Sequence, residues 1–197
     1  MAKLTGPFFS LKASGQLGKT IVAFPWKGIN ALRTYVIPAN PKTEAQRTQR
    51  GYFEDAVDAW HDSDFSALDA AAWNRFAGIL AKIMSGFNAM IKTFVDEAIL
   101  GNTWEKLYQV TTSENLANSF TVTLHAATGL TPPTVHWGTS KTHFPGSQDI
   151  GEIDGGNYAT TIAGLTKNTL YYFYIDHGTT KVDYGRTGIY STRTLAA

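Results

Sequence analysis

The chain has 197 residues, of which 43% are hydrophobic, and it carries a net charge of +1 at pH 7. This length allows one large domain or two small ones with cores of their own. The sequence contains no cysteine, which excludes a disulfide framework and any zinc site built on thiolates. It also has no apolar run with the length of a signal peptide or a membrane span, so we expect the protein to be made in the cytoplasm without a signal peptide.

The small net charge conceals an uneven distribution. Residues 1–50 contain eight basic residues and one acidic residue, a net charge of +7, whereas residues 51–100 contain three basic and eight acidic residues, a net charge of −5. Opposite charges of this size favour contact between the two stretches, either within one chain or between neighbouring copies. Nucleic acid is a less favoured partner, because the basic residues are spread along the chain and do not form one patch.

Residues 1–42 are predicted to form an extended arm and a β-hairpin. Thr20 to Phe24 has the composition of a short strand, Pro25 to Gly28 that of a turn, and Ile29 to Ile37 that of the returning strand. A two-stranded ribbon is marginally stable in water. The hairpin must therefore dock on its own chain or on another subunit.

Residues 43–103 are predicted to form three helices. Pro38 and Pro41 end the preceding strand, because proline donates no hydrogen bond to a ladder. The first helix is expected over residues 43–61, the second from Ser66 with Asp69 in its cap, and the third from Phe87 to Leu100. The second helix is expected to bury one apolar face, made of Leu68, Ala72, Trp73, Phe76, Ile79, Leu80 and Ile83.

Residues 104–197 change to the alternating pattern of strands. Turn-forming residues separate the apolar segments, as in an antiparallel sandwich. Five strands are expected, at Phe120–Leu124, Thr134–Gly138, Tyr158–Ile162, Leu170–Ile175 and Thr187–Leu195. The predicted fold class is therefore α+β and multidomain: a β-arm with a hairpin, a three-helix segment, and a C-terminal β-sandwich.

The C-terminal part resembles a fibronectin type III domain. The resemblance lies in Gly164-Leu165-Thr166-Lys167-Asn168-Thr169-Leu170-Tyr171, where a leucine stands six residues before a tyrosine. In that family the tyrosine forms a corner, with its ring in the core and its hydroxyl bound to nearby backbone. Pro133–Ser140 and Ser191–Leu195 are similar to other strands of the family. This resemblance implies a fold and not a function.

The N-terminal half resembles a segment of poorly characterised bacteriophage virion and bacterial proteins. The matching residues are Ser14, Gly15, Gly18, Lys27, Gly28, Arg33, Pro38–Thr43, Gln46, Arg50, Trp60, Ala72–Asn74 and Ser85–Asn88. The resemblance implies a virion setting, and it carries no mechanism.

No catalytic, cofactor or metal site is predicted. The five histidines are scattered, and no nucleophile stands beside a base in a recognisable motif. His61 with Asp62 and Asp64 is more simply a link between helices than a metal site. Asp149, Glu152 and Asp154 lie in a glycine-rich stretch that does not follow the ligand order of a calcium loop.

We expect a non-enzymatic structural protein that assembles with copies of itself, and with other virion or filament proteins, and that ends in a virion or an extracellular assembly. The expected subunit contacts are Trp26, Arg33, Tyr35, Arg47 and Arg50. The alternative is a module that binds a glycan or a protein through an aromatic platform of Tyr172, Tyr174 and Tyr190. A hydrolase or an accessory domain of an enzyme is a third possibility, but the sequence shows no titratable cluster for it.

Overall fold

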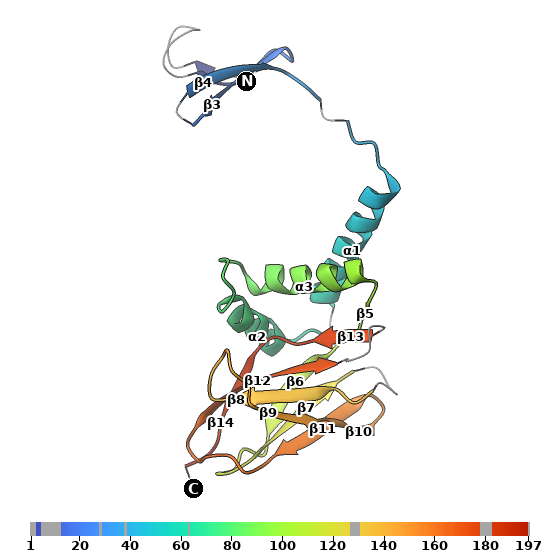
Figure 1. Cartoon of the computed structure of the whole chain (residues 1–197), viewed down its shortest axis with the longest axis vertical. Coiled ribbons are helices and arrows are strands. Elements are labelled where there is room, and N and C mark those ends of the chain that lie inside the picture. Colours follow the sequence, from blue (N-terminus) through green and yellow to red (C-terminus); the bar gives the residue numbers. More distant parts are fainter. Residues whose placement is uncertain are drawn as a thin grey trace. The chain divides into compact units, whose positions relative to one another are not determined.

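A computed structural model describes residues 3–4, 13–27, 29–37, 39–62, 64–126, 131–177 and 183–196. The chain divides into two compact units, Met1–Thr43 (unit 1) and Glu44–Ala197 (unit 2). Unit 1 is a sheet, and unit 2 contains three helices and a β-sandwich (Figure 1). The predicted α+β class is confirmed.

Unit 1 is a four-stranded antiparallel sheet in the order β1-β2-β3-β4, where the sequence predicted only a hairpin. The strands are β1 (Lys3–Leu4), β2 (Ala13–Leu17), β3 (Ile21–Trp26) and β4 (Ile29–Thr34). The β3–β4 turn is shorter than predicted, because Trp26 already pairs with Ile29. Lys27, in this turn, has the left-handed φ of 48° that such tight turns require.

Strand β4 ends at Thr34 and not at Ile37 as predicted. The Tyr35 N–H still donates to the Thr20 carbonyl at 2.8 Å. The chain before Thr20 does not continue alongside β4, because Gly18 adopts a φ of +51° in the turn that connects β2 to β3. Residues 36 and 37 therefore have no residues of β3 opposite them with which to pair.

The three helices of unit 2 are α1 (Glu44–His61), α2 (Ala67–Ala77) and α3 (Gly86–Leu100). Ser66 caps α2 in the predicted capping box with Asp69, and Gly101 ends α3 with a φ of 84°. The predicted face of α2 is wrong at its end, because the helix stops at Ala77 before a turn at Gly78. Ile79 and Leu80 lie beyond the helix and pack partly buried against its core cluster, whereas Ile83 is fully exposed. Leu68, inside the helix, is 56% exposed and does not belong to the buried face either.

The sandwich has two sheets. The first has the order β10-β11-β7-β6, and the second the order β5-β13-β12-β8-β9, with β14 also paired to β12. Five strands lie near the predicted positions: β7 (Phe120–His125), β8 (Thr134–Gly138), β11 (Asn157–Ile162), β12 (Leu170–His177) and β14 (Tyr190–Arg193). The remaining strands are β5 (Thr103–Trp104), β6 (Tyr108–Ser113), β9 (Gly146–Asp149), β10 (Gly151–Asp154) and β13 (Asp183–Arg186).

This strand order, with a hydrogen bond at the tyrosine corner, is that of a fibronectin type III-like sandwich, as the sequence predicted. The Thr166 N–H donates to the Tyr171 hydroxyl at 3.0 Å, while the Tyr171 ring lies in the core. Phe120, Val122, Phe173 and Ile175 from the two sheets are fully buried between them.

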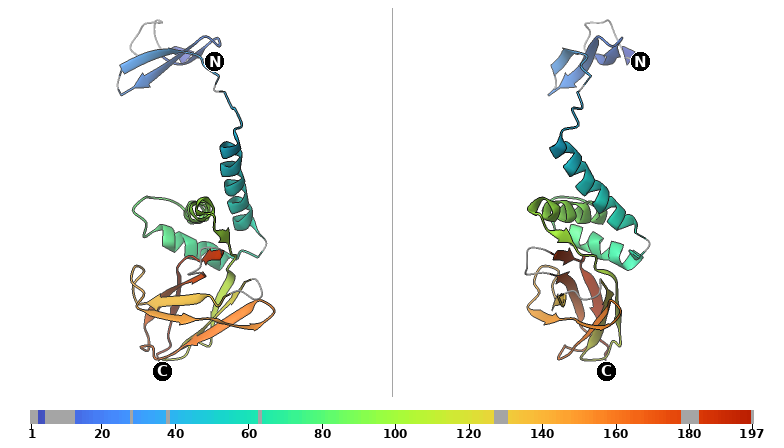
Figure 2. Two further views of the ribbon diagram at one scale, coloured as in Figure 1. Left: turned by 45° about the vertical axis from the view of Figure 1, so that its right-hand side comes forward. Right: turned by 90° about the vertical axis from the view of Figure 1, so that its right-hand side faces the viewer.

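The helices pack at one end of the sandwich, and α2 lies against β6 and β14 (Figures 1 and 2). At this contact the chain segment that pairs with β12 after residue 182 is broken into β13 and β14. The Ile189 N–H donates to the Ala72 carbonyl at 3.0 Å, and a Cβ on Gly188 would lie 2.3 Å from the Ala72 backbone. The predicted strand Thr187–Leu195 therefore starts only at Tyr190, because the residues before it dock on the helix.

Candidate assembly surface

The described residues of unit 1 form one sheet and add no second layer to it. None of the unit 1 side chains that the structure describes is buried. Six large apolar side chains are exposed: Leu17, Trp26, Ile29, Leu32, Val36 and Ile37. Exposed apolar surface of this kind on a small sheet is typical of interaction sites.

The register of the β3–β4 pair separates two faces. Trp26 lies opposite Ile29, Phe24 opposite Ala31, and Val22 opposite Arg33, so these six side chains share one face. The Arg33 guanidinium lies 5.4 Å from the centre of the Phe24 ring, as expected for diagonal neighbours on one face. We call this the aromatic face; Trp26 and Ile29 on it are 61% and 70% exposed.

The other face of the sheet is aliphatic. Leu17 lies opposite Ile21, and Leu32 opposite Ala23, so these side chains share the second face. Leu32 is more than half exposed. Both faces thus present apolar side chains, which is typical of a sheet that another layer or another strand completes.

Strand β4 forms an edge of this sheet. Because Tyr35 and Thr20 form a hydrogen-bonded pair, alternation along the ladder turns the N–H groups of Asn30, Leu32 and Thr34 away from β3. An edge of this kind is a template for a further strand. It offers directional main-chain hydrogen bonds to a partner.

The five predicted contact residues belong to two different units. Trp26 and Arg33 share the aromatic face, and Tyr35 lies half-buried just after β4. Arg47 and Arg50 belong to unit 2, where they lie on the exposed first turns of α1. Ile29 and Leu32 were not identified from the sequence, because they lie on opposite faces of β4 and form no single alternating pattern.

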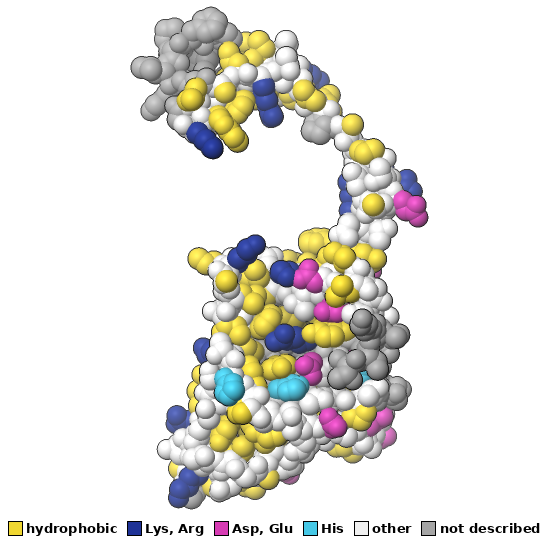
Figure 3. Space-filling view, viewed as in Figure 1, with side chains coloured by type: hydrophobic (Ala, Val, Ile, Leu, Met, Phe, Trp, Pro, Cys, Tyr) yellow, Lys and Arg dark blue, Asp and Glu magenta, His cyan; other side chains and the backbone are white. Residues whose placement is uncertain are grey.

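The division into units sharpens the charge asymmetry. Unit 1 contains six basic residues and no acidic residue, whereas unit 2 contains eleven basic and sixteen acidic residues. The net charges are therefore +6 and −5. Figure 3 shows basic and apolar side chains together on the surface of unit 1. A partner for this surface should be apolar and negatively charged.

The predicted tyrosine platform is wrong for Tyr190. This side chain is only 6% exposed, and its hydroxyl donates to Asp69 Oδ1 at 2.5 Å. The residue lies on β14, whose register places it opposite Phe173 on the core face of β12. Its ring stacks on the Phe173 ring at a centroid distance of 5.3 Å.

Tyr172 and Tyr174 do share the other face of β12, but they are half-buried and already have neighbours. The Tyr174 ring stacks on His136 and meets Phe144 edge to face. The Arg186 guanidinium lies 4.8 Å from the Tyr174 ring and 4.4 Å from the Phe76 ring. These contacts engage the ring of Tyr174 from several sides, so it does not offer a free surface for a flat sugar ring.

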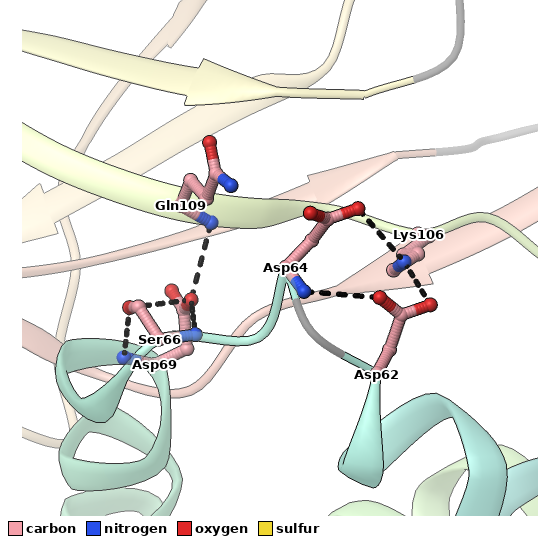
Figure 4. A network of polar contacts seen from close by, with 6 residues as sticks. All are labelled: Asp62, Asp64, Ser66, Asp69, Lys106 and Gln109. Carbon is pink, nitrogen blue, oxygen red and sulfur yellow. Dashed lines mark hydrogen bonds and ion pairs between the residues drawn. The ribbon is translucent and has the colours of Figure 1, made fainter.

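Asp69 connects α2 with both sheets of the sandwich, whereas the sequence indicated only a capping role for it. It is 1% exposed, and Figure 4 shows its carboxylate facing Ser66 and Gln109. Oδ2 accepts hydrogen bonds from the Ser66 N–H, the Ser66 hydroxyl and the Gln109 N–H, at 2.9, 2.7 and 3.1 Å. Oδ1 accepts the bond from Tyr190. Burial and the nearby carboxylate of Asp69 raise the pKa of Tyr190 well above its ordinary value.

Asp62 and Asp64 both contact a lysine. Lys106 Nζ lies 2.5 Å from Asp62 Oδ2 and 3.7 Å from Asp64 Oδ2 (Figure 4). The hydrogen bond from Lys106 lowers the pKa of Asp62. Among the residues that the structure describes, no three His, Asp or Glu side chains gather as a metal site.

A hollow of about 620 Å³ lies over the outer side of the first sheet. Its lining includes Leu68, Thr123, His125, Ile153 and Asn157. The lining is mainly hydroxyl, amide and aliphatic groups, and it also includes Asp64 and Ser66, whose hydroxyl donates to Asp69. None of the described helices is both long and apolar enough to cross a membrane.

No protein-family model matches the sequence, and no curated protein matches it. Solved structures resemble the C-terminal half. The chicken CNTN1 FN1-FN3 domains are 13% identical, with a TM-score of 0.36, over 48% of this chain and 32% of the chicken chain. The chain thus spans about a third of that protein. The FN5 domain of Drosophila Lar is 15% identical, with a TM-score of 0.36, over 49% of this chain and 99% of that domain.

A bacterial structure is similar to the same extent. The sensor domain of the anti-sigma factor RsgI4 in Pseudobacteroides cellulosolvens is 14% identical, with a TM-score of 0.35, over 47% of this chain and 76% of that one. These similarities concern the sandwich alone.

Proposed function

We propose that this chain is a non-enzymatic structural protein that assembles with copies of itself, as a component of a bacteriophage virion or a subunit of a filament. Unit 1 makes the contact between copies, and the sandwich faces outward. The observation that carries the proposal is the apolar surface of unit 1: four large apolar side chains on its sheet and two just after β4 are exposed, and no side chain of this unit that the structure describes is buried. The virion setting rests on the resemblance of the N-terminal half noted in the sequence.

The charges of the two units give the assembly a direction. Two copies of unit 1 would bring two charges of +6 together, whereas unit 1 and a neighbouring unit 2 carry +6 and −5. Head-to-tail association is therefore favoured over a symmetric contact of unit 1 with itself. A head-to-tail contact generates a ring when the rotation closes and a filament when it does not.

The test is the mass of the full-length protein in solution as a function of concentration, followed by electron microscopy of the same fractions. Rings, shells or filaments that disappear when Trp26 and Ile29 are both replaced by serine would support the proposal. If the protein is a monomer at all concentrations, unit 1 makes no contact between copies, and the proposal is refuted.

A further inference from the structure

We infer that β4 of one copy adds as a strand to the open edge of β10 in the next copy. This inference rests on the proposed assembly and names the surface that receives unit 1. It would extend the sheet β10-β11-β7-β6 of one molecule with the sheet β1-β2-β3-β4 of its neighbour.

Both strands lie at the ends of their sheets. β4 has six residues and β10 has four, and all four residues of β10 are exposed. Within the described strands of unit 2, the other sheet ends are less suitable. At β6 the Gln109 N–H already donates to Asp69, and β5 has only two residues. β9 has no large exposed apolar side chain.

Apolar surface is present on both edges. Ile29 on β4 and Ile153 on β10 are each 70% exposed, and Leu32 on β4 is 53% exposed. Isolated aliphatic side chains of this size are ordinary at a surface. Here they lie on two strands that have no further strand beside their outer edge among the described residues. One contact would therefore bury the apolar side chains and also provide partners for the outer main-chain groups.

Charge favours pairing of β4 with β10 over pairing of β4 with β4 or of β10 with β10. β4 carries Arg33 and follows Lys27, whereas β10 carries Glu152 and Asp154 and follows Asp149. Two β4 edges would repel each other, and so would two β10 edges, while β4 and β10 attract. A β-bulge between Glu152 and Asp154 also makes β10 an irregular edge that disfavours indiscriminate pairing.

The absence of cysteine from the sequence makes cross-linking a direct test. One full-length chain would carry Ile153→Cys, and a second would carry a cysteine in place of Asn30, Ala31 or Leu32, one at a time. The two chains would be mixed at a concentration where the wild type assembles and then oxidised. Ser147→Cys, at the exposed edge strand β9, replaces Ile153→Cys in the control mixture.

We expect a disulfide-linked dimer of the two variants for at least one β4 position with Ile153→Cys, and at least fivefold less with Ser147→Cys. If the variants assemble to the wild-type mass but cross-link no better at Ile153 than at Ser147, the β10 edge is not the acceptor, although the proposed function stands. If the wild type itself does not assemble, both the proposed function and this inference are refuted.

Charge reversal gives an independent readout that needs no cysteine. Arg33→Glu should weaken association a few-fold, and the added substitution Asp154→Lys should restore it, because the second change again places opposite charges on the two edges. Lys167→Glu, in an exposed turn of the sandwich, changes the net charge equally and is the control. Failure of Asp154→Lys to restore association would contradict the pairing of these edges.

Discussion

The hydroxyl of Tyr190 donates a 2.5 Å hydrogen bond to Asp69 Oδ1 in the interior of unit 2. The two residues are 121 positions apart, one at the start of α2 and the other on β14. Because Asp69 also accepts backbone N–H groups of β6, the carboxylate binds the helical segment to both sheets. The helices and the sandwich should therefore unfold together.

Removal of either partner should destabilise the whole of unit 2. We expect Tyr190→Phe to lower the free energy of unfolding by about 2 kcal/mol, because it removes one hydrogen bond to a charged group. Asp69→Asn should cost about 3 kcal/mol or more, since a buried amide cannot accept from all the donors that surround the carboxylate. Urea unfolding followed by circular dichroism and by tryptophan fluorescence measures both values.

The control for this pair is Tyr172→Phe, on the other face of β12, which should change stability by less than about 0.5 kcal/mol. Both probes should give one common transition in the wild type. Separate transitions for the helices and the strands would contradict the role assigned to Asp69.

Stability should fall at alkaline pH, in part through Tyr190. The pKa of Tyr190 is raised in the folded protein, mainly by burial and then by Asp69, so the folded state holds the phenolic proton more tightly than the unfolded state. Its contribution is thus fully present below the unfolded pKa of about 10 and is lost as the pH rises above it. We expect the stability difference between wild type and Tyr190→Phe to shrink from pH 9 to pH 11, as measured by urea unfolding. A constant difference would contradict this assignment.

Two glycines should respond to alanine in opposite directions. A Cβ on Gly188 would lie 2.3 Å from backbone atoms of α2, so Gly188→Ala should destabilise unit 2 by about 1–3 kcal/mol. Gly51 lies inside α1, where a Cβ would have no neighbouring atom within 4 Å, so Gly51→Ala should stabilise that helix by about 0.5–1 kcal/mol. Thermal unfolding of the two variants measures both changes. A neutral Gly188→Ala would show that the sandwich does not dock tightly on α2.

Association between copies should weaken as salt concentration rises. The two units carry net charges of +6 and −5, and exposed charges are screened over about 10 Å at 0.1 M salt but over only about 3 Å at 1 M. Light scattering at a fixed protein concentration should therefore show a smaller mean mass at 1 M salt than at 0.1 M. If the mass instead rises with salt, the apolar surface dominates and charge does not direct the contact.

The elements with local signals could be predicted from the sequence. The capping box of Ser66 and Asp69 and the tyrosine corner at Tyr171 each depend on residues a few positions apart, and both are present. Local patterns of this kind were sufficient to locate the three helices and five of the strands of unit 2.

The predictions failed where distant residues decide the structure. Tyr190 was grouped with two tyrosines of β12, but its register opposite Phe173 and its hydrogen bond to Asp69 on α2 place it in the core. The break before β14 arises from the contact of Gly188 with α2. Strands β1 and β2 had no strong pattern of their own, because they depend on β3 for their pairing. The exposed surface of unit 1 likewise became visible only once its register was known.

The most direct test of the proposed assembly is the mass of the full-length protein by light scattering over a wide range of concentration. The chain has a mass of 21.5 kDa. We predict that the mean mass rises to multiples of this value, and that a variant with both Trp26→Ser and Ile29→Ser stays at 21.5 kDa throughout. A wild-type protein that remains at 21.5 kDa at every concentration would contradict the account.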